Sequence, residues 1–295
     1  MSENALETPS GKTAQDENFP VGSFLIRPSL RRHVHVFYTF ARAGDDIADN
    51  PELTPDEKVE RLIRMGEIIQ GKRSGEGESA SAIRMRASLD ETGITPQHCL
   101  DLLGAFTQDA RKARYRNWDE LLGYCFLSAA PVGRQLLDLH GEDLSSRGAA
   151  DALCNALQVV NHLQDCGKDY QALDRVYLPT DDLAAEGCRI EDLGGPALTP
   201  ALRRVVDRVI VPFDALLADC ADLVRIVEDT RIALECQVIR NMCVKLTTRL
   251  KREDPLATRI VLTKPGAAGL ALSGITGGLW RRWTEPRPNK PAVAA

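Results

Sequence analysis

The feature that most constrains the fold is the spacing of the apolar residues, which recur at three- and four-residue steps along most of the chain. Val34, Phe37, Tyr38 and Ala41 follow this spacing, which places them on one face of a helix. The apolar and polar alternation that is typical of strands is scarce throughout. We therefore predict an all-α fold, a single-domain antiparallel helical bundle with an apolar cavity between facing helices.

Glycine, proline and asparagine signals divide this pattern into separate helices. A capping residue, Thr54, precedes Pro55 and two acids, which is typical of a helix start. The expected helices cover residues 29–49, 55–70, 81–90, 96–113, 118–140, 147–173, 199–227 and 230–250.

Composition limits the classes of function. The 295 residues carry a net charge of −5, which argues against a broad basic surface for nucleic acid. The eight cysteines form no CxxC pair and no zinc-like group with histidines, so we expect free thiols in a reducing compartment. Because we find no signal-peptide core and no run of eighteen apolar residues, we expect a cytoplasmic protein.

The two ends differ in character from the middle of the chain. We expect a disordered N-terminal tail at 1–17, a helical domain at 18–264 and a C-terminal tail at 265–295. The last segment is rich in Gly and Ala and ends in Arg281, Arg282 and Trp283. Two interpretations stay open: peripheral contact with the inner face of the cytoplasmic membrane, or a partly ordered tail on the bundle, since its glycines disfavour helix.

The strongest local signal is the sequence FARAGDDIADN. Its Arg42, Asp45 and Asp49 step by three and four residues and share one helix face, with Asp46 beside them. Two carboxylates one turn apart repel each other, and oxygen ligands suit a hard cation such as Mg²⁺. The alternative is an exposed acidic helix end.

A second polar stripe occurs on the helix expected at 147–173. Gln158, Asn161, Asp165 and Asp169 are separated by three, four and four residues, and their neighbours are apolar. Buried polar groups of this kind need a ligand or a metal, whereas a surface stripe does not. Two facing carboxylate stripes indicate Mg²⁺ ions that bridge to a diphosphate, beside a dry cavity that shelters a carbocation.

These motifs resemble those of the squalene/phytoene synthase family, the head-to-head trans-isoprenyl diphosphate synthases. The resemblance covers residues 18–264, and the fold that it implies is the isoprenoid synthase helical bundle. It rests on four motifs in the family's order: FYTFAR-x-x-DDIAD, YCFLSAAPVG, the Gln158 to Asp169 stripe, and DRVYLP at 174–179. ENFPV at 17–21 and DPLATR at 254–259 are most similar to the bacterial hydroxysqualene synthases of hopanoid biosynthesis.

The resemblance implies roles for individual residues. The implied magnesium ligands, or close partners of ligands, are Asp45, Asp46, Asp49, Asp165 and Asp169. The implied substrate-binding residues are Arg42 and Arg259, for diphosphate oxygens, and Gln158 and Asn161, for the second metal site. Tyr124 is implied to line the cavity near the cation and to be catalytic with Asp45 and Asp165, although an ordinary core tyrosine would also fit.

Two positions depart from the family pattern. Gln164 stands where arginine is common, and Lys168 stands where an acid is common. The loss of arginine favours the second half-reaction, in which presqualene diphosphate and water give hydroxysqualene and diphosphate. Lys168 either replaces the missing charge or is a surface lysine. His162 and Cys166 are interpreted as packing residues, because two side chains do not make a zinc site.

Other activities remain open. Presqualene diphosphate synthase, squalene synthase and phytoene synthase share the aspartate helices, and a non-catalytic scaffold would share the fold. The expected partners are a prenyl diphosphate substrate, a membrane surface, and other squalene-pathway enzymes that receive the product.

Overall fold

The computed structural model describes residues 6–9, 11, 23–75 and 77–288, and this part of the chain is all-α. The helices of the first half are α1 (Arg31–Asp49), α2 (Pro55–Ile69), α3 (Ala80–Thr92), α4 (Gln97–Asp109), α5 (Trp118–Ser128) and α6 (Ala130–His140). Those of the second half are α7 (Arg147–Gln164), α8 (Cys166–Leu173), α9 (Thr180–Ala185), α10 (Pro200–Asp219), α11 (Leu223–Ile226), α12 (Thr230–Leu250) and α13 (Lys264–Thr284). Two short 3₁₀ helices are present: η1 (Leu144–Ser146) lies between α6 and α7, and η2 (Ile190–Gly194) lies between α9 and α10.

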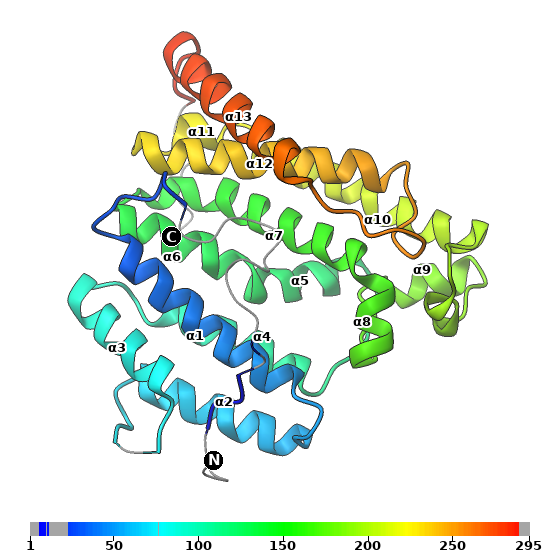
Figure 1. The fold of residues 1–295 in the computed structure, drawn as a ribbon, viewed down its shortest axis with the longest axis horizontal. Helices are drawn as coiled ribbons and strands as arrows, with labels where there is room; N and C mark the ends of the chain where they lie inside the picture. Colours follow the sequence, from blue (N-terminus) through cyan, green and yellow to red (C-terminus); the bar gives the residue numbers. More distant parts are fainter. Residues whose placement is uncertain (1–5, 10, 12–22, 76, 289–295) are drawn as a thin grey trace.

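Helix α7 lies at the centre of the bundle, where it packs against α5, α6, α10 and α12 (Figure 1). Its apolar residues, with those of α10 and α12, form the larger core. Helices α1 to α4 form a second group with a core of its own, in the lower part of Figure 1. The predicted all-α bundle is therefore confirmed.

Three expected helices are interrupted. The segment 199–227 ends as α10 at Asp219 and resumes as α11 at Leu223. The segment 118–140 divides at Ala129 into α5 and α6, because Pro131 has no N–H to continue the hydrogen-bond ladder. The segment 147–173 divides at Asp165, whose backbone (φ −105°, ψ 10°) leaves the helical region. The second polar stripe therefore spans a break between α7 and α8 rather than one continuous helix.

Residues 264–284, where glycines were expected to disfavour helix, instead form helix α13 on the outer side of α12 (Figure 1). Its glycines permit close packing: a Cβ at Gly274 would lie 2.8 Å from Val238 Cα, and one at Gly278 would lie 2.7 Å from Leu234 Cδ2. The glycines thus allow the helix to dock rather than prevent it. No helix in the described part of the chain is long and apolar enough to cross a membrane.

A few residues of the expected N-terminal tail are described. Leu6 is buried in the core of α1 to α4, and Glu7 accepts hydrogen bonds from Ser79 Oγ (2.6 Å) and Ser81 N (2.7 Å). Residues 6 and 7 are therefore anchored to the bundle. Residues 8, 9 and 11 are also described. The rest of the expected disordered tail at 1–17 lies outside the described residues, and so does the ENFPV motif at 17–21. The eight cysteines are free thiols, as expected.

Candidate active site

The carboxyl end of α1 and the junction of α7 and α8 line one cavity of about 240 Å³, which we call the acidic cavity. Its walls are Arg42, Asp45, Asp49, Asp109, Tyr124, Gln158, Asn161, His162, Asp165, Asp169, Leu173, Arg175 and Tyr177. The two polar stripes, which are distant in the sequence, therefore converge. The alternative that both are exposed acidic surfaces does not fit this arrangement.

On α1, the acidic cavity is lined by the residues whose spacing predicted a shared helix face, Arg42, Asp45 and Asp49. Arg42 Nη1 lies 2.7 Å from Asp45 Oδ2 and 3.8 Å from Asp46 Oδ1. Asp46 is buried and is not among the residues that line the acidic cavity. Of the three aspartates in this motif, Asp45 and Asp49 thus face the space that a metal or diphosphate would occupy.

On α7 and α8, all four members of the second stripe line the acidic cavity. Gln158 Nε2 lies 3.2 Å from His162 Nε2. Burial, and then the nearby charge of Asp165, raise the pKa of Asp169 to about 7. This pair of crowded carboxylates would be stabilised in the charged form by a cation.

Arg175 belongs to the site although the sequence analysis gave it no role. Its Nη1 donates to Asp49 Oδ1 (2.6 Å) and its Nη2 donates to Ala48 O (3.3 Å). Burial opposes the charge, but the carboxylates of Asp109 and Asp49 raise the pKa of Arg175, so it remains protonated. The preceding Asp174 adopts a left-handed backbone (φ 51°), which ends α8 before Arg175.

Asp109, the last residue of α4, was also missed. Tyr124 Oη donates to Asp109 Oδ2 (2.7 Å), while Asp109 Oδ1 has no hydrogen-bond partner within the described residues. Burial raises the pKa of Asp109 to about 6, against the lowering effect of Arg175 and Tyr124. No spacing rule singles out this residue, because the carboxyl meets its partners only after α4 and α5 pack together.

Tyr124 fits both of its interpretations, since it is a buried aromatic with a satisfied hydroxyl and it also lines the cavity. It belongs to an aromatic group with Tyr115, Tyr177 and His162. The His162 ring stacks on Tyr177 with centroids 3.6 Å apart, and burial, then Arg175, lowers its pKa to about 3. His162 is therefore a neutral packing residue whose ring also faces the cavity; Cys166 is buried in the core.

An apolar cavity of about 360 Å³ continues from the acidic one. The two share Arg42, Asp45, Tyr124, Gln158 and Asn161. The remaining walls come from α1, α4, α5, α6, α7 and α12, and they are Tyr38, Ala41, Leu102, Phe106, Ser128, Ala129, Val132, Gly133, Leu136, Cys154, Leu157 and Ile239. A ligand with a charged head and a hydrocarbon body fits this pair of cavities.

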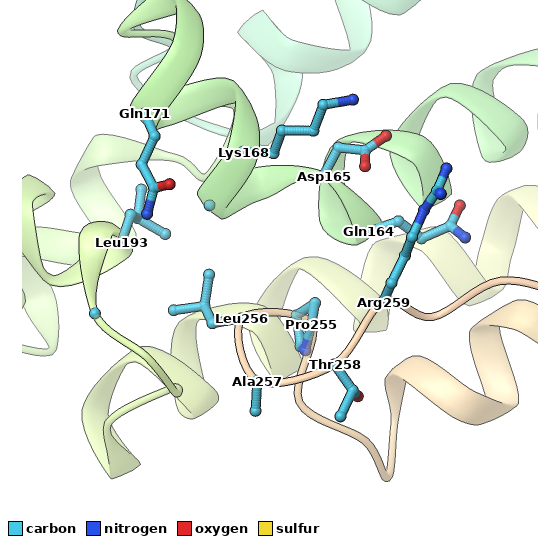
Figure 2. Close-up of a pocket in the computed structure, with 12 residues that line it drawn as sticks. Gln164, Asp165, Lys168, Gln171, Leu193, Pro255, Leu256, Ala257, Thr258 and Arg259 are labelled. Carbon is cyan, nitrogen blue, oxygen red and sulfur yellow. The ribbon is translucent and has the colours of Figure 1, made fainter. Parts of the chain in front are cut away.

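On its other side, Asp165 faces an outer pocket of about 450 Å³, which Figure 2 shows. Lys168 and Arg259 supply its cationic groups, and the Arg259 side chain extends toward the side where Asp165 and Gln164 lie (Figure 2). Gln164 is buried, and its Nε2 donates to Ile260 O, the carbonyl next to Arg259. Gln164 therefore ties the loop that carries Arg259 to α7, and Lys168 is a wall residue of the pocket.

The donor set of the acidic cavity fits a hard divalent cation that also binds a ligand. Asp45, Asp49, Asp165 and Asp169 supply carboxylate oxygens in one cavity. In the described part of the chain no three His, Cys, Asp or Glu residues lie close enough to hold a metal by themselves. That arrangement suits Mg²⁺, which is typically held by one or two carboxylates together with water and substrate phosphates.

The chain is similar to known proteins over most of its length. The chain is 45% identical over 260 residues to the hydroxysqualene synthase of Rhodopseudomonas palustris, which covers 88% of each chain. It is 40% identical to that of Zymomonas mobilis, over 94% of this chain and 93% of the relative. The solved squalene synthase from Alicyclobacillus acidocaldarius superposes with a TM-score of 0.67 at 28% identity, over 79% of this chain and 87% of that one.

The squalene/phytoene synthase family model matches residues 12–265, which include both aspartate motifs and the loop that carries Arg259. On this match, and on the relatives that are 40% and 45% identical over most of their length, the chain belongs to the squalene/phytoene synthase family.

Proposed function

We propose that the protein is a hydroxysqualene synthase, which converts presqualene diphosphate and water to hydroxysqualene and diphosphate in squalene and hopanoid biosynthesis. The observation that carries the proposal is the junction of an acidic cavity with an apolar one through five shared residues. The hydroxysqualene synthases of Rhodopseudomonas palustris and Zymomonas mobilis, similar over most of this chain, support the same activity.

In the first step the bond between the substrate carbon and the diphosphate oxygen breaks, and both electrons leave with the diphosphate. Asp45, Asp49, Asp165 and Asp169 would hold Mg²⁺ beside that group, with Asp46 supporting Arg42 from behind. Bound Mg²⁺ would stabilise the negative charge that develops on the diphosphate oxygens. Arg42, at the boundary of the two cavities, would donate to the same oxygens.

On the outer side, Arg259 and Lys168 would bind the diphosphate from the pocket that Asp165 shares with the acidic cavity. Gln164, which stands where the family commonly has arginine, would contribute by fixing the Arg259 loop through Ile260. Gln158 and Asn161 lie on the boundary between the cavities and would orient the metal-bound head group.

The carbocation left behind rearranges within the apolar cavity, whose aliphatic walls keep out bulk water. Tyr124 lines this cavity, and the face of an aromatic ring carries negative charge density that attracts a cation. Water then forms a C–O bond to the rearranged cation, and the resulting oxonium loses a proton to give the alcohol.

The exposed face of α13 supports contact with a lipid surface. Leu272, Leu279, Trp280 and Trp283 are exposed on this helix, and Lys264–Thr284 contains no acidic residue. Tryptophan and leucine on one helix face favour the membrane interface. A cytoplasmic enzyme bound in this way at the inner face of the cytoplasmic membrane would deliver its apolar product to lipid or to the next squalene-pathway enzyme.

The membrane proposal is tested by co-sedimentation with anionic phospholipid vesicles. We expect the double variant Trp280→Ser and Trp283→Ser to lose most of its vesicle binding. The matched control is Val211→Ser, which removes an exposed apolar side chain from α10. Equal binding by all three proteins would exclude α13 as the contact.

The activity itself is tested by product analysis with purified protein. We expect hydroxysqualene from presqualene diphosphate, with Mg²⁺ and without NADPH, and no product from farnesyl diphosphate. Asp45→Asn and Asp165→Asn should abolish turnover, whereas Asp207→Asn, at an exposed ion pair on α10, should retain it. Presqualene diphosphate from farnesyl diphosphate would instead indicate the first half-reaction, and no turnover of any prenyl diphosphate would favour a scaffold.

A further inference from the structure

Asp109 is a buried carboxyl group that has no role in the proposed binding of diphosphate. It ends α4 and is 9% exposed. One oxygen, Oδ2, accepts a hydrogen bond of 2.7 Å from Tyr124, and the other, Oδ1, has no partner among the described residues. A buried acceptor without a partner costs roughly 1 to 3 kcal/mol, so its retention calls for a functional explanation.

The position of Asp109 relative to the two cavities is specific. Asp109 lines the acidic cavity, and Tyr124, to which it is bonded, lines both that cavity and the apolar one. The carboxyl group therefore lies behind a hydroxyl group at the boundary where the hydrocarbon body of a ligand meets its charged head. A water molecule that reacts with a cation in the apolar cavity would be in contact with this boundary.

The reaction needs a proton acceptor at that place. When the water oxygen bonds to the cationic carbon, the product is an alkyl oxonium ion, and one of its O–H bonds must release a proton to give the alcohol. We propose that Asp109 accepts this proton, directly on Oδ1 or through Tyr124, whose hydroxyl takes the proton of the oxonium while passing its own to Oδ2. The inference rests on the proposed hydroxysqualene synthase activity.

The charged groups around Asp109 do not prevent it from accepting a proton. Arg175, whose charge lowers the pKa of Asp109, donates its hydrogen bonds to Asp49 and Ala48 O. The other groups that influence Asp109 are Tyr124, through its hydrogen bond, and Asp49, whose charge raises the pKa. With a pKa of about 6, set mainly by burial, Asp109 is ionised near neutral pH and is a stronger base than an exposed aspartate.

The neighbouring groups are poorer acceptors. His162 has its pKa lowered to about 3 by burial, so its ring does not hold a proton near neutral pH. Tyr177 is buried, which raises its pKa well above the ordinary value of a phenol and keeps it protonated. The departing diphosphate is the remaining competitor, and it is the alternative that an experiment must separate from Asp109.

The test compares the wild type with Asp109→Asn and Asp109→Glu in single turnovers of presqualene diphosphate with Mg²⁺. Diphosphate release reports ionisation, and the fraction of product recovered as hydroxysqualene reports water capture. We expect Asp109→Asn to release diphosphate within a few-fold of the wild-type rate, with the hydroxysqualene fraction at least about tenfold lower and the balance as elimination products. Asp109→Glu should restore part of the alcohol, which a purely structural role would not predict.

The control is Asp151→Asn, since Asp151 is a similarly buried carboxyl paired with Arg134 and absent from the walls of these cavities. Its product fractions should match the wild type. The wild-type alcohol fraction should also rise with pH as Asp109 ionises, and that of Asp109→Asn should not. If Asp109→Asn fails to fold, Asp109→Ser takes its place, with a similar loss of alcohol expected.

Two results would overturn the inference. An unchanged alcohol fraction in Asp109→Asn, or in Asp109→Ser where it is used, would assign proton removal to diphosphate or water. An equal fall of diphosphate release and alcohol would assign Asp109 to the ionisation step instead. If the wild type itself releases no diphosphate from presqualene diphosphate, the proposed function fails, and that failure is distinct from both results.

Discussion

Replacing Arg175 with methionine should destabilise the protein and change its response to magnesium. Arg175 is buried, and its Nη1 lies 2.6 Å from Asp49 Oδ1. Removing one partner of a buried ion pair typically costs about 3 to 5 kcal/mol, because the other charge loses its compensation. The Asp49 side chain is 25% exposed, so water screens part of its charge, and we expect a loss of about 2 to 3 kcal/mol.

The assay is urea unfolding followed by circular dichroism at pH 8, with and without Mg²⁺. A cation bound beside Asp49 would replace part of the missing charge, so Mg²⁺ should stabilise Arg175→Met more than it stabilises the wild type. The double variant Arg175→Met, Asp49→Asn should recover part of the lost stability, because it removes the Asp49 charge together with its partner. The recovery is partial, because Asp109 still lacks the nearby charge of Arg175.

Arg134→Met is the matched control, since Arg134 pairs with Asp151 at 2.6 Å and does not line the acidic cavity. It should lose stability without gaining extra stabilisation by Mg²⁺. The reasoning is refuted if Arg175→Met unfolds at the same urea concentration as the wild type, or if Mg²⁺ affects Arg134→Met and Arg175→Met equally.

Three further predictions concern single positions. Because burial raises the folded pKa of Asp109 to about 6, stability falls as pH rises from about 4 to 6; Asp109→Asn should remove this fall and raise the free energy of unfolding at pH 8 by about 1 to 2 kcal/mol, measured by urea titration at several pH values. Gln164→Leu removes the hydrogen bond to Ile260 O and should raise KM for the diphosphate substrate about fivefold, with a smaller change in kcat. A fivefold fall in kcat with an unchanged KM would contradict the loop-positioning role. Gly274→Leu forces a side chain onto Val238 and should lower Tm by several degrees and expose α13 to limited proteolysis; unchanged Tm and digestion would show that close packing there is dispensable.

Local patterns were sufficient to predict most of the bundle. Apolar spacing identified the long helices, and Thr54, which forms a capping box with Glu57, was correctly expected to begin one. The three- and four-residue steps also predicted that Asp45 and Asp49 share a face, which the acidic cavity bears out. These features depend on contacts within a helix, and such contacts can be read from consecutive residues.

Features that depend on tertiary contacts were missed. Arg175 lay in a motif that was recognised, but its pairing with Asp49 joins segments far apart in the sequence. Asp109 has no distinguishing neighbours in the sequence, and its importance arises from burial beside Tyr124. The glycines of α13 were interpreted as unfavourable for a helix because propensity considers a helix alone, whereas Gly274 serves the packing against α12.

Crystals grown with Mn²⁺ in place of Mg²⁺ and a non-hydrolysable presqualene diphosphate analogue would test the central claim most directly, through anomalous scattering from the metal. The account predicts Mn²⁺ in the acidic cavity, coordinated by Asp45 or Asp49 on one side and by Asp165 or Asp169 on the other, with the hydrocarbon in the apolar cavity. Metal and diphosphate bound elsewhere, with these four carboxylates uncoordinated, would contradict it.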